Sequence, residues 1–283
     1  MVICKVTGVG RGATWATDGT IIFATGGTAG LWRVSADGRE AEPFTTPQQK
    51  SVEFTSGHKL PSILPGDEWV LFVDSPQGQF DDGRILARSI RTGEEREVFR
   101  GGSAPRNFPR AWTPDGKALL FQRGTGALFN DLWLLPLDGS RTPKPYIASR
   151  FNEGRAAISP DGRLVAYESN ESGRDEIYLR LFEGGSTVQV STGGAAVPTW
   201  SANGRELFFQ TDAGLTGVSI VPGSNLTVSP PRVLLDASAG VLAGVSSDGK
   251  RFLMIKRDMQ RAAFTFNVVV GWFEELRRKV NGH

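Results

Sequence analysis

The chain has 283 residues, with 32 lysines and arginines against 30 aspartates and glutamates, two histidines and one cysteine. This near balance of charge argues against a nucleic acid as the main partner. So few histidines and cysteines exclude a zinc site built from those ligands. No run of 18 or more apolar residues is available to cross a bilayer, so we expect no membrane insertion by this chain.

The chain begins with a predicted strand at residues 2–6, followed by Gly8, Gly10 and Gly12. The glycines match part of a dinucleotide-binding fingerprint, but no helix follows them, so a flexible link is the better interpretation. Residues 15–23 then give the first hairpin signal, a Thr-Asp-Gly turn between two apolar segments.

The hairpin pattern recurs along the chain and is most complete at residues 158–167, which contain Ser-Pro-Asp-Gly. Proline presets φ, aspartate can bond to the backbone two residues on, and glycine accepts a positive φ. Similar segments lie at residues 63–72, 112–121, 200–209 and 245–254. The turns follow one another at intervals of 42 to 49 residues, a period typical of a four-stranded propeller blade.

Each repeat continues with signals for a third and a fourth strand, except the sixth, which has no fourth strand after residue 270. The count closes if residues 2–6 supply that outer strand and so join the two ends of the chain. We therefore predict one all-β domain over residues 1–283, a six-bladed β-propeller of four-stranded antiparallel blades. The predicted blades span residues 12–46, 60–100, 110–148, 156–191, 198–236, and 243–270 plus 2–6.

The tail has a different period, because Trp272, Phe273, Leu276 and Val280 fall on one helical face. We expect a short amphipathic C-terminal helix at residues 271–280. It either caps the last blade or docks a partner.

The Ser-Pro-Asp-Gly hairpins and residues 169–178 make the chain resemble the TolB-like, WD-repeat-like propellers of bacteria, over essentially its whole length. Residues 251–256 and 267–276 are most similar to the end of the propellers fused behind bacterial eukaryotic-like serine/threonine kinases. This resemblance implies an extracytoplasmic, periplasmic sensor domain of a larger membrane-anchored protein, with a cytoplasmic location as the alternative. It leaves open whether the chain is a complete ring or a fragment with further blades upstream.

The chain carries no kinase His-Arg-Asp or Asp-Phe-Gly motif and no Gly-x-Ser-x-Gly elbow. Of its two histidines, His283 is the last residue, which leaves only His58 as a base for a nucleophile. We therefore expect neither an enzyme nor a cofactor.

Acidic residues keep two alternatives open. Asp74, Asp81 and Asp82 on a long hairpin could hold Ca²⁺, but their spacing matches no calcium loop and a solvated turn is the simpler interpretation. Paired carboxylates on the rim could serve a glycoside hydrolase or polysaccharide lyase, although hydrogen bonding between blades at the rim is the simpler interpretation of them.

Polar residues on the loops that lead into inner strands are candidates for a ligand site, because propellers gather ligands there. The candidates are His58, Arg106, Asn107, Arg110, Asn152, Glu153 and Arg155, and also Asp131 and Glu176, which lead into third strands. The prediction is a monomeric, non-catalytic module for protein interaction or ligand sensing, with a protein or small ligand bound at the loop face.

Overall fold

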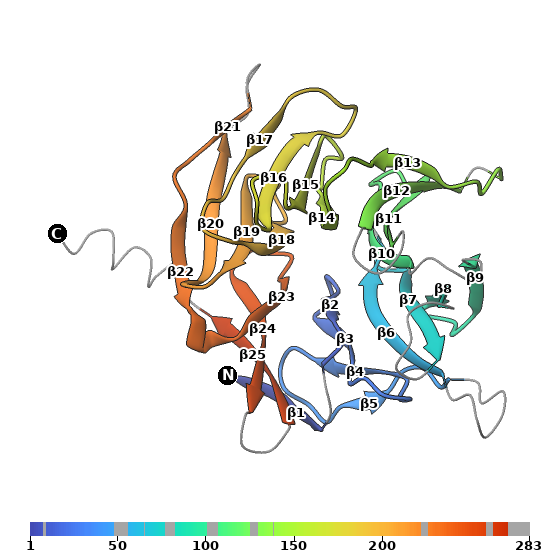
Figure 1. Cartoon of the computed structure of the whole chain (residues 1–283). Coiled ribbons are helices and arrows are strands. Elements are labelled where there is room, and N and C mark those ends of the chain that lie inside the picture. Colours follow the sequence, from blue (N-terminus) through green and yellow to red (C-terminus); the bar gives the residue numbers. More distant parts are fainter. Residues whose placement is uncertain are drawn as a thin grey trace.

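The computed structural model describes residues 1–7, 10–47, 56–64, 66–76, 83–100, 107–124, 130–137, 139–221, 226–258 and 263–270. Within these ranges every regular element is a β-strand apart from one 3₁₀ turn at Ala237–Ala239. The strands form a ring of sheets around a central axis (Figure 1), which confirms the prediction of an all-β propeller. The predicted C-terminal helix at residues 271–280 lies outside the described residues.

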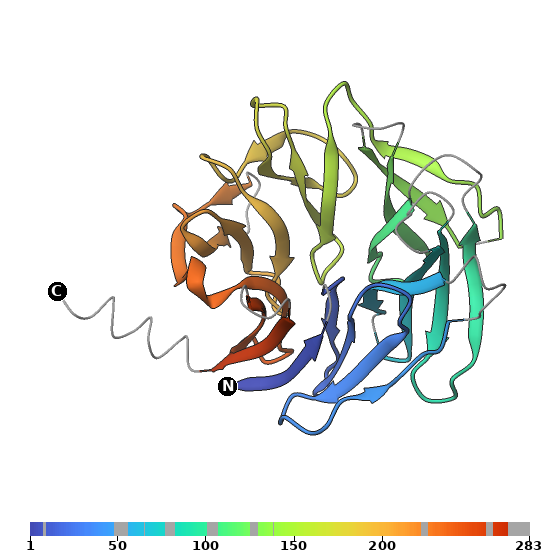
Figure 2. The ribbon, with the colours of Figure 1, turned by 60° about the horizontal axis from the view of Figure 1, so that its bottom comes forward.

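The described strands form six sheets, which we number in the chain order of their inner strands (Figure 2). From inner to outer strand, the first three sheets contain β2 (Ala13–Trp15), β3 (Thr20–Ala24), β4 (Leu31–Ser35) and β5 (Glu42–Pro43); β6 (Ser56–Ile63), β7 (Trp69–Pro76), β8 (Arg84–Ser89) and β9 (Glu95–Arg100); and β10 (Asn107–Trp112), β11 (Ala118–Gly124), β12 (Asn130–Pro136) and β13 (Lys144–Ile147). The other three contain β14 (Glu153–Ile158), β15 (Leu164–Ser169), β16 (Glu176–Leu181) and β17 (Thr187–Gln189); β18 (Ala196–Trp200), β19 (Glu206–Thr211), β20 (Gly214–Val221), β21 (Thr227–Val228) and β22 (Arg232–Asp236); and β23 (Val241–Val245), β24 (Arg251–Asp258), β25 (Ala263–Val270) and β1 (Val2–Thr7).

The N-terminal strand closes the ring as predicted. β1 pairs antiparallel with β25, from Val2 opposite Asn267 to Thr7 opposite Ala263, and forms the outer strand of the sixth sheet. Hydrogen bonds between the two ends of the chain therefore hold the first and last repeats together, as the missing fourth strand of the sixth repeat required.

The fifth sheet departs from the predicted four strands, which the other five sheets have. Its third strand, β20, is eight residues long and pairs with two short strands. β22 pairs with residues 214–217 of β20, and β21 pairs with Ile220 and Val221 at its far end. A long third strand leaves room for this second outer partner, and residues 227–228 carry no strand signal strong enough to predict it.

The hairpin turns show why the repeated motif folds as it does. In the fourth sheet, Ser159 Oγ donates to Asp161 Oδ1 (2.6 Å), and the N–H groups of Arg163 and Leu164 donate to Asp161 and Ser159. Gly162 takes a φ of 74°, which favours glycine. The hydrogen bond from Ser159 holds the pKa of Asp161 below its usual value. The motif is therefore a self-contained turn that can be repeated without tertiary help.

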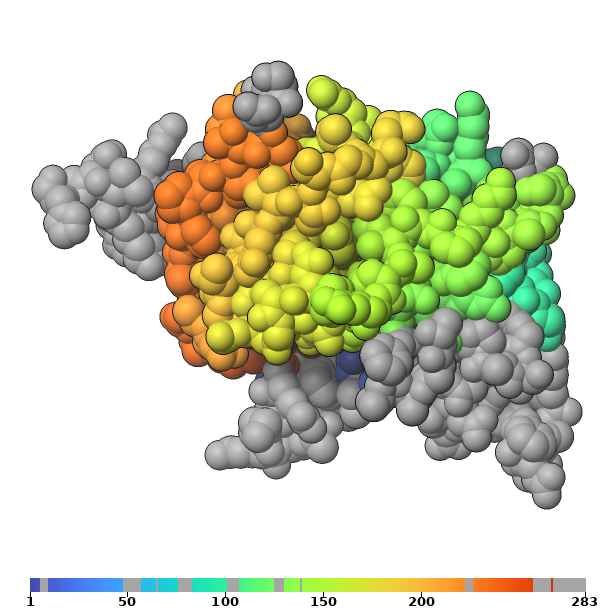
Figure 3. All heavy atoms as spheres, turned by 45° about the horizontal axis from the view of Figure 1, so that its top comes forward, coloured from blue at the N-terminus to red at the C-terminus, as the bar shows by residue number. Residues whose placement is uncertain are grey.

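Neighbouring sheets pack face to face through aromatic side chains. The rings of Phe23 and Phe266 lie 4.7 Å apart between the first and sixth sheets, and those of Phe208 and Phe252 lie 5.0 Å apart between the fifth and sixth. The Trp200 indole donates to the Ala157 carbonyl of the fourth sheet (3.1 Å). Figure 3 shows the atoms of the third, fourth and fifth sheets lying side by side on one face of the molecule.

Candidate functional site

A central channel of about 680 Å³ runs between the inner strands of all six sheets. Each of these strands, β2, β6, β10, β14, β18 and β23, contacts the next around the ring, and β23 contacts β2. The channel is therefore enclosed by the fold itself, and every repeat contributes to its wall.

Bulges in the inner strands shape this wall. The register against the second strand shifts within β6, β10, β14, β18 and β23. Three residues at these bulges take a positive φ, Leu60 (53°), Arg155 (35°) and Val197 (60°), which is uncommon for residues other than glycine. Their N–H groups are directed at the preceding sheet, where they donate to the Arg11 carbonyl, Gln122 Oε1 and Glu168 Oε1 respectively. These three bulges thus tie the second, fourth and fifth sheets to the sheet before each of them, beside the channel.

Two arginines and their partners form a polar cluster between the third and fourth sheets. Gln122 Oε1 accepts hydrogen bonds from Arg110 Nε (3.0 Å) and Arg110 Nη2, and from the Arg155 N–H (3.2 Å). Glu168 Oε1 accepts from Arg155 Nη1 (3.2 Å) and from the Val197 N–H (2.7 Å). Both arginines line the channel, and the sequence analysis named both among its candidates for a ligand site.

Burial shifts the titration of this cluster. It lowers the pKa of Arg110 to about 10, with the positive charge of Arg155 adding to the effect. Burial also raises the pKa of Glu168, and the nearby Arg155 only partly opposes that rise. The guanidinium groups of Arg110 and Arg155 therefore both lie near a single carboxylate, that of Glu168, which is itself poorly solvated.

The described lining of the channel is basic. It includes Arg11, Arg110 and Arg155 and contains no aspartate or glutamate. Its other polar side chains are hydroxyls, those of Thr14, Ser62 and Thr199. An anionic or hydrogen-bonding group is therefore the best match for this surface.

His58 lies behind the channel wall and is not in its lining. Its Nδ1 lies 2.6 Å from Thr45 Oγ1, and because the Leu31 N–H donates to that oxygen, the Thr45 hydroxyl proton is free to point at the ring. Its Nε2 is 3.8 Å from Asp74 Oδ1. Burial lowers the pKa of His58 to about 4, so the imidazole is neutral at pH 7. The ring is a buried structural partner of these groups.

Glu153 is bonded to the loop that precedes its strand, and Glu176 to the loop that follows β17. The Ser149 hydroxyl donates to Glu153 (2.5 Å), and burial raises the pKa of Glu153. The Ser191 hydroxyl and the Gly194 N–H donate to Glu176 (2.5 and 2.8 Å). Neither carboxylate belongs to the channel lining, which matches the interpretation of rim hydrogen bonding.

Asn152 links the third and fourth sheets on the loop face. Its Oδ1 accepts from the backbone and side-chain N–H groups of Asn130 (both 2.9 Å), and its own N–H donates to Asn170 (2.9 Å). Asp131 is half-buried beside Asn130, and burial raises its pKa. Asn107 is buried at the start of β10 and does not line the channel.

The remaining predicted residues divide between the described and undescribed parts of the chain. Arg106, Asp81 and Asp82 lie outside the described residues. Asp74 is buried, and its carboxylate accepts a hydrogen bond from Arg84 Nε (2.8 Å). No group of three or more histidines, cysteines, aspartates or glutamates that could hold a metal occurs within the described ranges.

The sequence analysis missed Gln122 and Glu168, although the repeats contain a signal for them. In each sheet the last residue of the inner strand pairs with a residue of the second strand. Gln122 and Glu168 lie three residues after that paired residue in their own sheets. At this position the six sheets carry Ala24, Val73, Gln122, Glu168, Gln210 and Ile255. A polar residue at an otherwise apolar repeat position is a departure that a repeat alignment would have shown.

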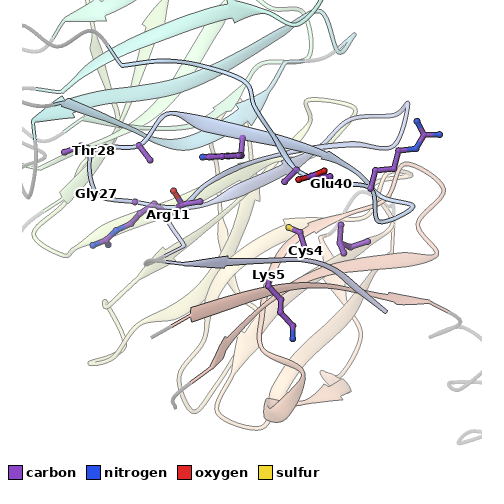
Figure 4. Close-up of a pocket in the computed structure, with 13 residues that line it drawn as sticks. Cys4, Lys5, Arg11, Gly27, Thr28 and Glu40 are labelled. Atoms are coloured by element: carbon purple, nitrogen blue, oxygen red, sulfur yellow. The ribbon is translucent and has the colours of Figure 1, made fainter. Parts of the chain in front are cut away.

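A second cavity, of about 980 Å³, lies between β1 and the first sheet (Figure 4). Cys4 and Lys5 of β1 form one side, and Gly27, Thr28 and Glu40 of the first sheet line it with Arg11, which also lines the channel. Burial raises the pKa of Cys4 to about 11, so the thiol stays protonated at neutral pH. The pairing of the two ends of the chain, which the sequence predicted, brings these residues together, but the cavity between them was not predicted.

No family model matches the chain. Tricorn protease homolog 1 of Streptomyces coelicolor is 35% identical over 85 residues, which are 29% of this chain and 8% of that protein. TolB from Acinetobacter baumannii superposes with a TM-score of 0.64 at 17% identity, over 89% of this chain and 64% of TolB. The fold is that of a TolB-like β-propeller.

Other propellers with this fold are enzymes. An oligogalacturonate lyase in complex with manganese superposes with a TM-score of 0.58 at 15% identity, over 92% of this chain and 78% of the lyase. At such identities the likeness concerns the fold alone, so function has to be argued from the side chains of this chain. In the described part of the chain, no helix is long and apolar enough to cross a membrane.

Proposed function

We propose that this ring of six blades is a non-catalytic binding module, which takes part of a protein or a small ligand into its central channel. The observation that carries the proposal is the channel itself, enclosed by all six inner strands and lined by Arg11, Arg110 and Arg155 without a described acidic residue. Its volume of about 680 Å³ lies within the range of pockets that hold small ligands or short peptide segments.

The environments of the acidic residues support binding over catalysis. General acid and base catalysis needs carboxylates that can reach a bound substrate. Glu176 is enclosed by Ser191 and Gly194, and Glu168 is engaged by Arg155 and the Val197 N–H. The only described histidine, His58, is buried behind the wall.

A selection experiment tests this function. The immobilised protein is exposed to a phage-displayed library of random twelve-residue peptides, alongside two variants of similar bulk. Thr199→Trp fills the channel, whereas Thr187→Trp places the same side chain on the exposed outer strand β17. We expect the wild type and Thr187→Trp to retain peptides that Thr199→Trp loses. A failure to retain any peptide, or equal retention by the filled channel, would contradict the proposal.

A carboxylate-based enzyme of the glycoside hydrolase or polysaccharide lyase type is the second candidate. It is supported by the raised pKa values of Asp131 and Glu153, which suit a general acid, and by the lyase that shares this fold. Incubation with trigalacturonate tests it. Turnover that disappears in Glu153→Gln would establish the enzyme and displace the binding module.

We further propose that the module is a monomer and the extracytoplasmic sensor part of a larger, membrane-anchored bacterial signalling protein. The support is the similarity of residues 251–256 and 267–276 to kinase-fused propellers. Sequencing the gene on both sides of this segment tests the fusion, and light scattering of the purified chain tests the monomer.

A further inference from the structure

Arg110 occupies a repeat position at which the other five sheets carry alanine or proline. It lies two residues before the end of its inner strand, where the six sheets carry Ala13, Pro61, Arg110, Ala156, Pro198 and Ala243. Since three other repeats fold with alanine there, packing of the wall does not require the arginine. Its charge is the feature that remains to be explained.

That charge lacks a counter-ion of its own in the described structure. Among the described residues, the Arg110 side chain donates two hydrogen bonds, from Nε and Nη2, and both go to the neutral amide oxygen of Gln122. The one nearby carboxylate, Glu168, is bonded to Arg155 and to the Val197 N–H. A poorly solvated guanidinium is costly unless it is paired, and the lowered pKa of Arg110 expresses that cost. The cluster therefore carries about one unbalanced positive charge at the channel wall.

Because guanidinium groups bind carboxylates through two parallel hydrogen bonds, we infer that Arg110 and Arg155 form a carboxylate-recognition subsite for an acidic peptide segment in the channel. This inference rests on the proposed function and names its ligand.

The rest of the lining favours a peptide over an acidic sugar. Sugars usually need an open aromatic face for stacking, but the Trp15 ring is covered by the Arg251 guanidinium (5.0 Å) and Trp200 is buried. Small, hydroxyl and aliphatic side chains, such as Thr14, Leu60 and Val197, make up most of the remaining surface. Such a surface accommodates an extended chain with modest side chains, while the two arginines select its acidic residue.

The same peptide library tests the inference with Arg110→Ala. Alanine is native to this position in three repeats, so we expect the variant to fold with an unchanged melting temperature. We expect peptides retained by the wild type to be enriched in aspartate and glutamate, and Arg110→Ala to lose that enrichment. By calorimetry, Arg110→Ala should bind a selected acidic peptide roughly tenfold more weakly or worse, since hydrogen bonds to charged groups are among the strongest.

Matched controls separate charge from position. Arg123→Ala removes an arginine that stacks on Trp133 instead of lining the channel, and should leave affinity unchanged. If Arg110→Ala fails to fold, Arg155→Gln serves in its place with the same expected loss. Peptides retained without acidic enrichment, or bound equally by Arg110→Ala, would overturn the subsite but leave the binding module standing. Retention of no peptide and no binding of trigalacturonate would remove both, whereas tight binding of trigalacturonate alone would overturn the peptide as ligand and leave the binding module standing.

Discussion

The two sides of the channel use one repeat position differently. The position lies in the second strand of each sheet. It comes three residues after the residue that pairs with the last residue of the inner strand. In the third, fourth and fifth sheets it is polar, and the residues are Gln122, Glu168 and Gln210. In the first, second and sixth sheets it is apolar, and the residues are Ala24, Val73 and Ile255. The strand pattern that the repeats share builds the ring. Polar residues at one position of that repeat make one side of the channel polar.

The largest expected effect is a loss of stability at low pH, and it comes from His58, which is buried behind the channel wall on the apolar side. The pKa of His58 is about 4 in the folded chain against 6.5 for the free side chain. Between these pH values the unfolded chain binds more protons, so stability present above pH 6.5 is lost as the pH falls towards 4. The expected loss is roughly 2–3 kcal/mol.

Urea unfolding at pH 7 and at pH 4.5 measures this loss. Subtracting the same difference for His58→Gln removes the contribution of all other groups. Identical pH dependence in the two proteins would show that His58 titrates normally and is not buried as described.

A smaller effect is expected for Glu168 on the polar side. Glu168→Ala leaves the Val197 N–H without its acceptor and Arg155 without its counter-ion. Because half of the Arg155 side chain is exposed and solvent screens it, we expect a loss of about 1–3 kcal/mol in the free energy of unfolding. Glu168→Gln keeps an acceptor for Val197 and should retain most of that stability. Equal losses in both variants would place the effect in the charge instead of the hydrogen bond.

The smallest effect compares two glutamines at the same repeat position. Gln122 accepts from Arg110 and Arg155, whereas Gln210 Oε1 is buried and has no hydrogen-bond partner within the described part of the chain. Gln210→Leu should therefore be neutral or stabilise the protein by up to about 1 kcal/mol, and Gln122→Leu should destabilise it by about 1–2 kcal/mol. Thermal unfolding of the two variants decides the matter. Equal destabilisation would mean that Gln210 has a structural role of its own.

The ring was predictable because its signals are local. A turn such as Ser159 to Gly162 satisfies its own hydrogen bonds, and the missing strand after residue 270 called for β1 to replace it. The second outer strand β21 was not predictable, since only the length of β20 creates a place for it. Short strands depend on an available edge more than on their own residues.

The site was predictable only in part. Arg110 and Arg155 were expected at the channel because they stand on segments entering inner strands, and they line it. His58 and Glu153 stand on similar segments, yet their side chains turn into the sheets, where Thr45 and Ser149 bond to them. A bulge of one residue decides which way such a side chain points, and nothing in a single sequence fixes that choice.

A crystal structure of the protein with one of its selected peptides tests the central claim most directly. We predict a carboxylate of the peptide within about 3 Å of the Arg110 guanidinium, in the channel and beside Arg155. A peptide bound on the outer loops, with Arg110 still bonded to Gln122 alone, would contradict the account.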